Sequence, residues 1–108
     1  MEIKATRTLV KSQPELWELL DDEPQLRHWS ERLGEVGDEI VVTAHEPGQR
    51  LAWRIPRGGP AVEITLAEKG FGTRVVIAAQ AEEDSAEEAL EHMLDDLSAP
   101  QRRPFSAA

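Results

Sequence analysis

Four consecutive segments between residues 39 and 80 alternate apolar and polar side chains, and three short turn segments separate them. The turns fall at residues 46–49, 57–60 and 69–72, and each contains glycine. If each hairpin is centred on its turn, twelve apolar side chains line up on one face of a four-stranded antiparallel sheet. The rows of that face are Ile40, Ile55, Val62 and Ala79, then Val42, Trp53, Ile64 and Ile77, then Ala44, Leu51, Leu66 and Val75. Since a one-residue slip would turn a strand's apolar side chains to the other face, the pattern predicts this register. On the opposite face we expect His45 and a cross-strand ion pair between Arg54 and Glu63.

Three helical segments can cover the apolar face. Serine followed three residues later by glutamate forms a capping box at residues 12–15 and again at residues 85–88, and each box starts a helix. Leu26, Trp29 and Leu33 follow helical spacing in a third segment, between these two. Behind the second box, an apolar stripe is formed by Ala86, Ala89, Leu90, Met93, Leu94 and Leu97. That stripe must be buried, and the apolar sheet face is the obvious partner for it.

The order of these elements defines the fold class. Residues 2–10 alternate and contain β-branched residues, so we expect a first strand at a sheet edge, beside the last strand. The order is then β-α-α-β-β-β-β-α, and one antiparallel sheet with helices on one face is an α+β fold. We expect a single domain over residues 1–98 and a flexible tail over residues 99–108.

Charge and composition exclude several classes of function. The formal net charge is −9, from 12 basic and 21 acidic side chains, which opposes binding to nucleic acid or to anionic lipid. No apolar stretch reaches the roughly 18–20 residues that a membrane span needs. The sequence has no cysteine and no visible signal peptide, so we expect a cytoplasmic protein. Eight acids between residues 82 and 96 are expected to form a solvated helix face, with a docking surface for a basic partner as the alternative.

Residues suited to catalysis or metal binding are scarce. The chain has no cysteine, no tyrosine and no Gly-x-Ser-x-Gly turn, and its three histidines lack ligand spacing, so we expect no catalytic residue, metal site or cofactor. His92 falls between two acids on a helix flank, which favours a surface ion pair over a general base. His28 is the one histidine that could point inward, although a place on the helix surface is favoured.

Arg7 is the one charged residue that the alternation places with inward side chains. If Ile3, Ala5 and Leu9 face the interior, period two carries Arg7 to the same side. A buried guanidinium needs a partner, which a ligand carboxylate could supply. Alternatively, Arg7 extends from an edge strand into water.

Several motifs, in order along the chain, resemble one known family. Residues 7–20 read RTLVKSQPELWELL, a strand that runs into a helix with a Leu-Trp pair, and His28-Trp29 follows in the second helix. Residues 46–53 read EPGQRLAW, a proline followed by Arg-Leu and an aromatic residue, and residues 70–75 read GFGTRV. The chain is similar to the START-like superfamily of polyketide cyclases, lipid-transfer domains and heat-shock-chaperone ATPase activators. It is shorter than the family pattern, because residues 30–38 leave no room for an additional strand pair.

This resemblance implies a helix-grip fold, in which the sheet curls around the C-terminal helix and leaves an apolar cavity. It favours a noncatalytic domain that binds a hydrophobic or amphipathic small molecule, although the same side chains could form a solid core. The ligand-binding residues would be Arg7, Trp29, Trp53, Ile64, Ile77, Leu90 and Met93. Two alternatives are an enzyme of the cyclase or dehydratase type, which needs an inward polar group, and a protein-interaction module that uses the acidic helix. The oligomeric state is not predicted.

Overall fold

The structure is a computed structural model that describes residues 2–33, 40–56, 61–80 and 86–99. Its elements follow the predicted order. They are β1 (Glu2–Leu9), α1 (Gln13–Leu20), α2 (Glu23–Leu33), β2 (Val41–Glu46), β3 (Arg50–Arg54), β4 (Ala61–Lys69), β5 (Gly72–Gln80) and α3 (Ala86–Ser98). Of the predicted tail, residues 100–108 lie outside the described residues.

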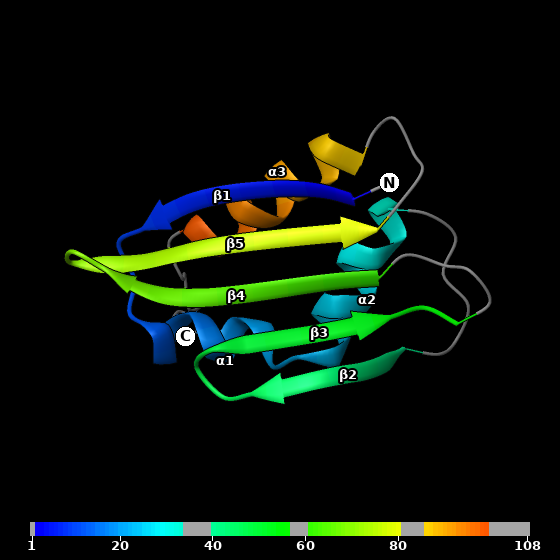
Figure 1. Ribbon diagram of the computed structural model, residues 1–108, viewed down its shortest axis with the longest axis horizontal. Helices are drawn as coiled ribbons and strands as arrows, with labels where there is room; N and C mark the ends of the chain where they lie inside the picture. Colours follow the sequence, from blue (N-terminus) through cyan, green and yellow to red (C-terminus); the bar gives the residue numbers. More distant parts are fainter. Residues whose placement is uncertain (1, 34–39, 57–60, 81–85, 100–108) are drawn as a thin grey trace, which may run out of the picture.

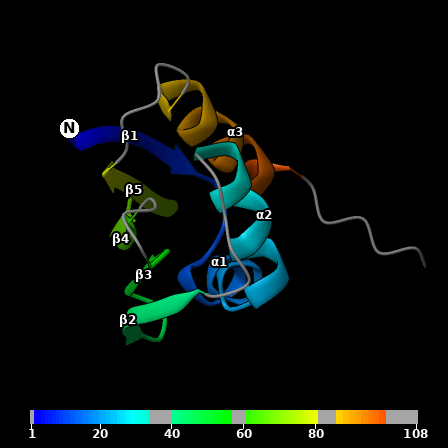
Figure 2. The same cartoon turned by 90° about the vertical axis from the view of Figure 1, so that its right-hand side faces the viewer.

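The five strands form one antiparallel sheet in the order β1-β5-β4-β3-β2 (Figure 1). β1 pairs with β5 at the edge of the sheet, as the sequence predicted. The three helices all lie on one side of the sheet, with α3 across the β1 end, α1 near the β2 end and α2 between them (Figure 2). The chain therefore has the expected α+β, helix-grip architecture.

The core lies between the sheet and the helices. The whole predicted stripe of α3 is buried in it, together with Leu16 and Leu20 of α1 and Leu26 and Trp29 of α2. α1 begins as predicted, because the Ser12 hydroxyl accepts a bond from the Glu15 amide and the Glu15 carboxylate accepts one from the Ser12 amide. The second capping box begins at residue 85, outside the described residues.

The register of β4 and β5 is the predicted one, with Val62 opposite Ala79 and Ile64 opposite Ile77. The register of β3 and β4 differs from the prediction by two residues, so Leu51 lies opposite Ile64. A shift of two preserves which side chains share a face, and Trp53 still points toward the helices.

This shift makes the predicted Arg54–Glu63 ion pair wrong. Arg54 lies opposite Ala61, and Glu63 lies opposite Ala52. The carboxylate of Glu63 instead accepts a bond from Nε of Arg50, at 2.6 Å. The prediction assumed that β3 and β4 pair symmetrically about residues 57–60. The observed pairs are not symmetric about those residues, which is the physical reason for the shift.

A β-bulge between Val42 and Ala44 changes the other edge of the sheet. Past the bulge, Ala44 lies opposite Ala52, and His45 lies opposite Leu51. The extra residue exchanges the two faces of the strand, so Ala44 leaves the predicted apolar row and His45 turns to the helix side. Both placements correct the sequence prediction. Val42, predicted as an inward residue, is 48% exposed at this edge strand.

Candidate functional site

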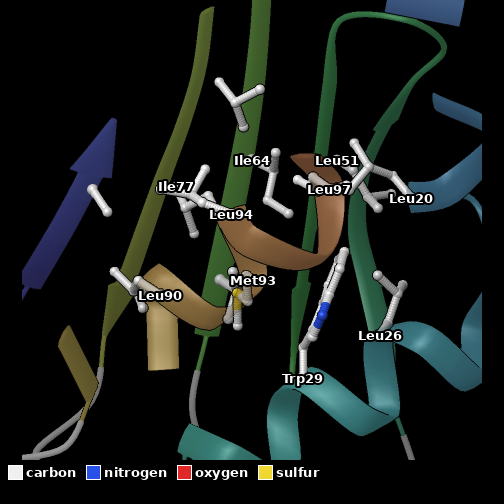
Figure 3. Close-up of a cluster of buried hydrophobic side chains, with 14 of the residues drawn as sticks. Leu20, Leu26, Trp29, Leu51, Ile64, Ile77, Leu90, Met93, Leu94 and Leu97 are labelled. Carbon is white, nitrogen blue, oxygen red and sulfur yellow. The ribbon is translucent and has the colours of Figure 1, made fainter. Parts of the chain in front are cut away.

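The six apolar residues predicted to form a binding wall lie together in one buried cluster. They come from five elements: Trp29 from α2, Trp53 from β3, Ile64 from β4, Ile77 from β5, and Leu90 and Met93 from α3. None of them is more than 1% exposed. Figure 3 shows Ile64 and Ile77 pointing from the sheet toward α3, with Met93 and Leu90 on the facing side of that helix. The cluster is therefore an apolar interior that the sheet, α2 and α3 enclose.

Trp29 links α2 to α3 by a polar contact at the rim of this interior. Its indole Nε1 donates a hydrogen bond of 2.9 Å to Oδ2 of Asp96. A buried indole N–H needs an acceptor, and Asp96 supplies one from the exposed flank of α3.

Trp53 links the sheet to α2 by a similar contact inside the core. Its Nε1 donates a 2.8 Å bond to the hydroxyl of Ser30, and that hydroxyl donates a 2.8 Å bond to the Leu26 carbonyl oxygen. Ser30 is completely buried, and sequence reasoning did not predict this role for it. A signal was present, since a buried indole demands an acceptor and Ser30 follows Trp29 on the apolar side of α2.

In the part of the chain that the structure describes, no buried polar side-chain atom lacks a hydrogen-bond partner. The only buried polar residues there are Ser30 and Thr73, and the Thr73 hydroxyl donates to the carbonyl oxygen of Lys11. The described interior therefore offers no unpaired side-chain donor or acceptor to a polar ligand group.

Arg7 lies on the helix side of β1, as the alternation predicted, but at the margin of the core. Its Nη1 donates to Oδ1 of Asp95 at 2.8 Å, and its Nη2 donates to Oε1 of Glu91 at 2.7 Å. The Arg7 side chain is 31% exposed, and both carboxylates are more than half exposed. The hydrogen bond to Asp95 raises the pKa of Arg7, desolvation opposes it, and the bond to Glu91 adds to the rise. Arg7 thus joins the edge strand to α3 by a forked ion pair (the Arg7 clamp).

The acidic stretch is therefore not only a solvated face. Glu91, Asp95 and Asp96 of α3 bind Arg7 and Trp29 of the same molecule. Glu87 is exposed, and Glu88 lies 3.8 Å from Nε2 of His92, in line with the surface pair predicted for that histidine.

The histidines do not form a reactive centre. His28 is exposed on α2, so it does not point into the apolar interior. His45 packs edge-on against Trp17, with ring centroids 5.2 Å apart, and its Nε2 lies 3.3 Å from Oδ1 of Asp21. Within residues 2–33, 40–56, 61–80 and 86–99, no group of three or more potential ligands could hold a metal ion.

Comparison with known proteins supports the architecture. No family model matches the sequence, and no curated protein matches it significantly. Solved structures do match. A crystal structure of a protein from Deinococcus radiodurans has a TM-score of 0.69 at 22% identity and covers 91% of this chain and 95% of its own.

Two further matches carry informative names. The Aha1 dimer from Colwellia psychrerythraea matches at a TM-score of 0.66 and 13% identity, covering 91% of this chain and 93% of its own. An AHSA1-like protein from Rhizobium etli matches at a TM-score of 0.68 and 18% identity, covering 91% and 79%. The chain has the START-like fold. At these identities the likeness establishes the fold alone, and the residues must carry any argument about function.

The lengths and hydropathy of the described helices decide whether any of them could cross a membrane. None of them is both long enough and apolar enough to cross a bilayer.

Proposed function

We propose that this START-like domain is a noncatalytic binding module that holds an apolar or amphipathic small molecule between the sheet and α3. The observation that carries the proposal is the convergence of Trp29, Trp53, Ile64, Ile77, Leu90 and Met93 on one apolar interior. Large apolar surfaces from several elements, with an adaptable methionine among them, suit a hydrocarbon ligand. The proposal keeps the cytoplasmic location that we expect from the cysteine-free sequence.

Binding requires α3 to act as a movable cover, because the wall side chains are closed against one another. Besides its buried apolar stripe, three polar contacts at the exposed flank of α3 hold it in place, namely the two bonds of the Arg7 clamp and the Trp29–Asp96 bond. Exposed ion pairs contribute only about 0–1 kcal/mol each, so the Arg7 clamp can part at small cost, and the larger cost of opening is the apolar stripe of α3 that leaves the sheet. A ligand's apolar surface would then replace the contacts that α3 loses with the sheet.

The hydrogen bonding of the buried polar side chains determines which part of a ligand can enter the interior. With every buried polar side-chain atom of the described residues already bonded, a polar group brought inside would lose its hydration without compensation. The inserted part must therefore be hydrocarbon or an aromatic ring. A carboxylate head group would stay at the rim, where Arg7 could exchange Glu91 or Asp95 for it.

The enzyme alternative needs an inward polar group, and the two candidates were His28 and Arg7. His28 is exposed, and Arg7 is engaged by two carboxylates at the margin. We therefore rank a cyclase or dehydratase below a binding module.

Ligand screening by native mass spectrometry and thermal shift tests the proposal. We expect myristate, palmitate or an aromatic polyketide to bind one per chain and to raise Tm. Met93→Trp fills the interior with a larger side chain and should abolish binding, whereas Glu18→Trp, on the exposed side of α1, should retain it. Absence of any stabilising ligand, or equal binding by Met93→Trp, would contradict the proposal.

The rim role of Arg7 is tested separately with a pair of related ligands. Arg7→Leu should weaken binding of a fatty acid relative to its methyl ester, because only the acid can use the guanidinium, whereas easier opening of α3 affects both ligands alike. Arg27→Leu, which removes a cation paired with Glu23 within α2, serves as the control. Equal loss for both ligands would assign Arg7 to structure and not to ligand binding.

A further inference from the structure

The face of the sheet that points away from the helices is left uncovered by every described element (Figure 2). Strand alternation places nine small side chains on this outer face, among charged ones. They are Thr6 and Thr8 of β1, Val76 and Ala78 of β5, Ala61, Thr65 and Ala67 of β4, Ala52 of β3 and Ala44 of β2. Such a surface admits close approach by another backbone.

The outer face also carries four unpaired cations. Lys4, Arg54, Lys69 and Arg74 alternate onto it, all are exposed, and none has an ion pair or hydrogen bond to another described residue. Of the other basic side chains, Arg7, Arg27 and Arg50 are bound by acids, and Lys11 is bound by the Ala99 carbonyl.

Acids do not balance these four cations on the same face. Glu46 and Glu63 also lie on this face and are both bound by Arg50, which leaves Glu2 as its one unpaired acid among the described residues. The described strands thus place five cations and three acids on the outer face. The outer face of the sheet thus carries an excess of positive charge, although the net charge of the chain is −9. Since charges separated by more than about 8 Å are screened at physiological salt, a partner on this face would feel mainly the local cations.

An exposed aromatic side chain stands at one end of this face. Phe71 is 104% exposed at the tip of the β4–β5 hairpin, which projects beyond the neighbouring strands (Figure 1, far left). Gly72 beside it lies so close to the Leu9 carbonyl that a Cβ could not be accommodated. Val10, 90% exposed, adjoins the same place. An exposed aromatic side chain that is close in sequence to Lys69 and Arg74 is of a type enriched at protein interfaces.

We propose that this cationic sheet face is a docking surface for an acidic partner protein, with Phe71 as the apolar anchor. Charge complementarity favours an acidic partner, because the four unpaired cations attract carboxylates. The small side chains between them contribute to binding only if the partner packs closely against the sheet, as a protein surface does. A fluid layer of lipid head groups does not supply such packing. A second copy facing the first across a two-fold axis would bring cations against cations.

The surface is independent of the proposed ligand site, which lies on the opposite side of the sheet. Loss of ligand binding in Met93→Trp should leave docking unchanged. Loss of docking in a cation variant should likewise leave ligand binding unchanged.

An NMR titration with poly-L-glutamate locates the electrostatic part of the surface. We expect amide shifts on β1, β3, β4 and β5 near Lys4, Arg54 and Arg74. The variant Arg54→Glu/Arg74→Glu should weaken the binding by about tenfold or more, and the control Arg27→Glu should change it less than about twofold. Shifts confined to the helices, or equal weakening by the control, would overturn the assignment of this face.

A second experiment identifies the class of partner. Proteins retained by the wild type but not by Phe71→Ser or Arg54→Glu/Arg74→Glu are purified and titrated individually. An acidic protein that binds with the same dependence on these residues, and more weakly in high salt, supports the proposal. Binding with that dependence to phosphatidylglycerol vesicles or to RNA in place of an acidic protein would overturn it, as would identical retention by all variants.

Discussion

At the scale of single residues, the interior is organised by two tryptophans whose indole N–H groups are both bonded. Trp29 finds its acceptor at the rim, on Asp96, while Trp53 finds one inside the core, on Ser30. Ser30 in turn donates to the Leu26 carbonyl, so a short polar chain crosses an otherwise apolar space. A bonded polar chain of this kind fixes the rotamers of the groups around it.

Ser30→Ala tests how much this chain contributes. It leaves the buried indole N–H of Trp53 without its acceptor, so we expect the free energy of unfolding to fall by about 1–3 kcal/mol. Urea denaturation followed by tryptophan fluorescence measures the change. Ser98→Ala is the matched control, because that exposed hydroxyl bonds only the Asp95 carbonyl and should cost less than about 0.5 kcal/mol.

The sequence predicted the inward position of Trp53 but not its partner. Alternation alone decides which face a strand residue occupies, whereas the acceptor depends on how α2 lies across the sheet. The same limit applies to Arg7. Alternation with Ile3, Ala5 and Leu9 predicted on which side of β1 the Arg7 side chain lies. It could not predict the two carboxylate partners, because they lie more than 80 residues away in α3.

At the scale of elements, the accuracy of the predicted strand register differed from one strand connection to the next. The β4–β5 turn is tight, so its centre fixed the register correctly. The β3–β4 connection allowed a two-residue shift, which preserved the faces but replaced the partner of Glu63. The bulge in β2 could not be inferred from alternation, and it exchanged the faces of Ala44 and His45.

Attachment of α3 to α2 can be tested with two substitutions at one position. Asp96→Ala removes the acceptor of the buried Trp29 indole, which should lower the free energy of unfolding by about 1–3 kcal/mol. Asp96→Asn keeps a carbonyl oxygen at that place and should recover most of the loss. If both variants unfold at the same urea concentration, the bond does not stabilise the docked helix.

Removal of α3 is the stronger test at this scale. Leu90, Met93, Leu94 and Leu97 are buried, and at about 1.5–3 kcal/mol each their burial is comparable with the whole stability of a small domain. A chain that ends at Gln80 should therefore give the circular dichroism of an unfolded protein. A chain that ends at Ala99 should keep the native spectrum, as the prediction of a tail beyond residue 98 requires.

At the scale of the whole molecule, the two sides of the sheet differ in packing and in charge. One side is closed by three helices whose exposed flanks are acidic, and the other presents small side chains with four unpaired cations among the described residues. This division separates the two proposals spatially, because an apolar ligand concerns the closed side and a protein partner the uncovered one.

The protection of backbone amides from hydrogen exchange should differ between the central and the edge strands of the sheet. β4 and β5 each pair with a strand on both sides, and their inward residues are fully buried, whereas β2 has one neighbour and a largely exposed pattern. Hydrogen exchange followed by NMR should be slowest in β4 and β5 and fastest among the strands in β2. Equal protection of β2 and β5 would show that the edge strand is covered by another molecule in solution.

The measurement that tests the central claim most directly is an isotope-filtered NOE experiment on the protein with saturating myristate. If the domain binds an apolar chain between the sheet and α3, the ε-methyl group of Met93 and the methyl groups of Leu90 and Ile64 should show NOEs to the myristate methylenes. NOEs found only to exposed side chains, or none to Met93 while myristate is bound, would contradict the account.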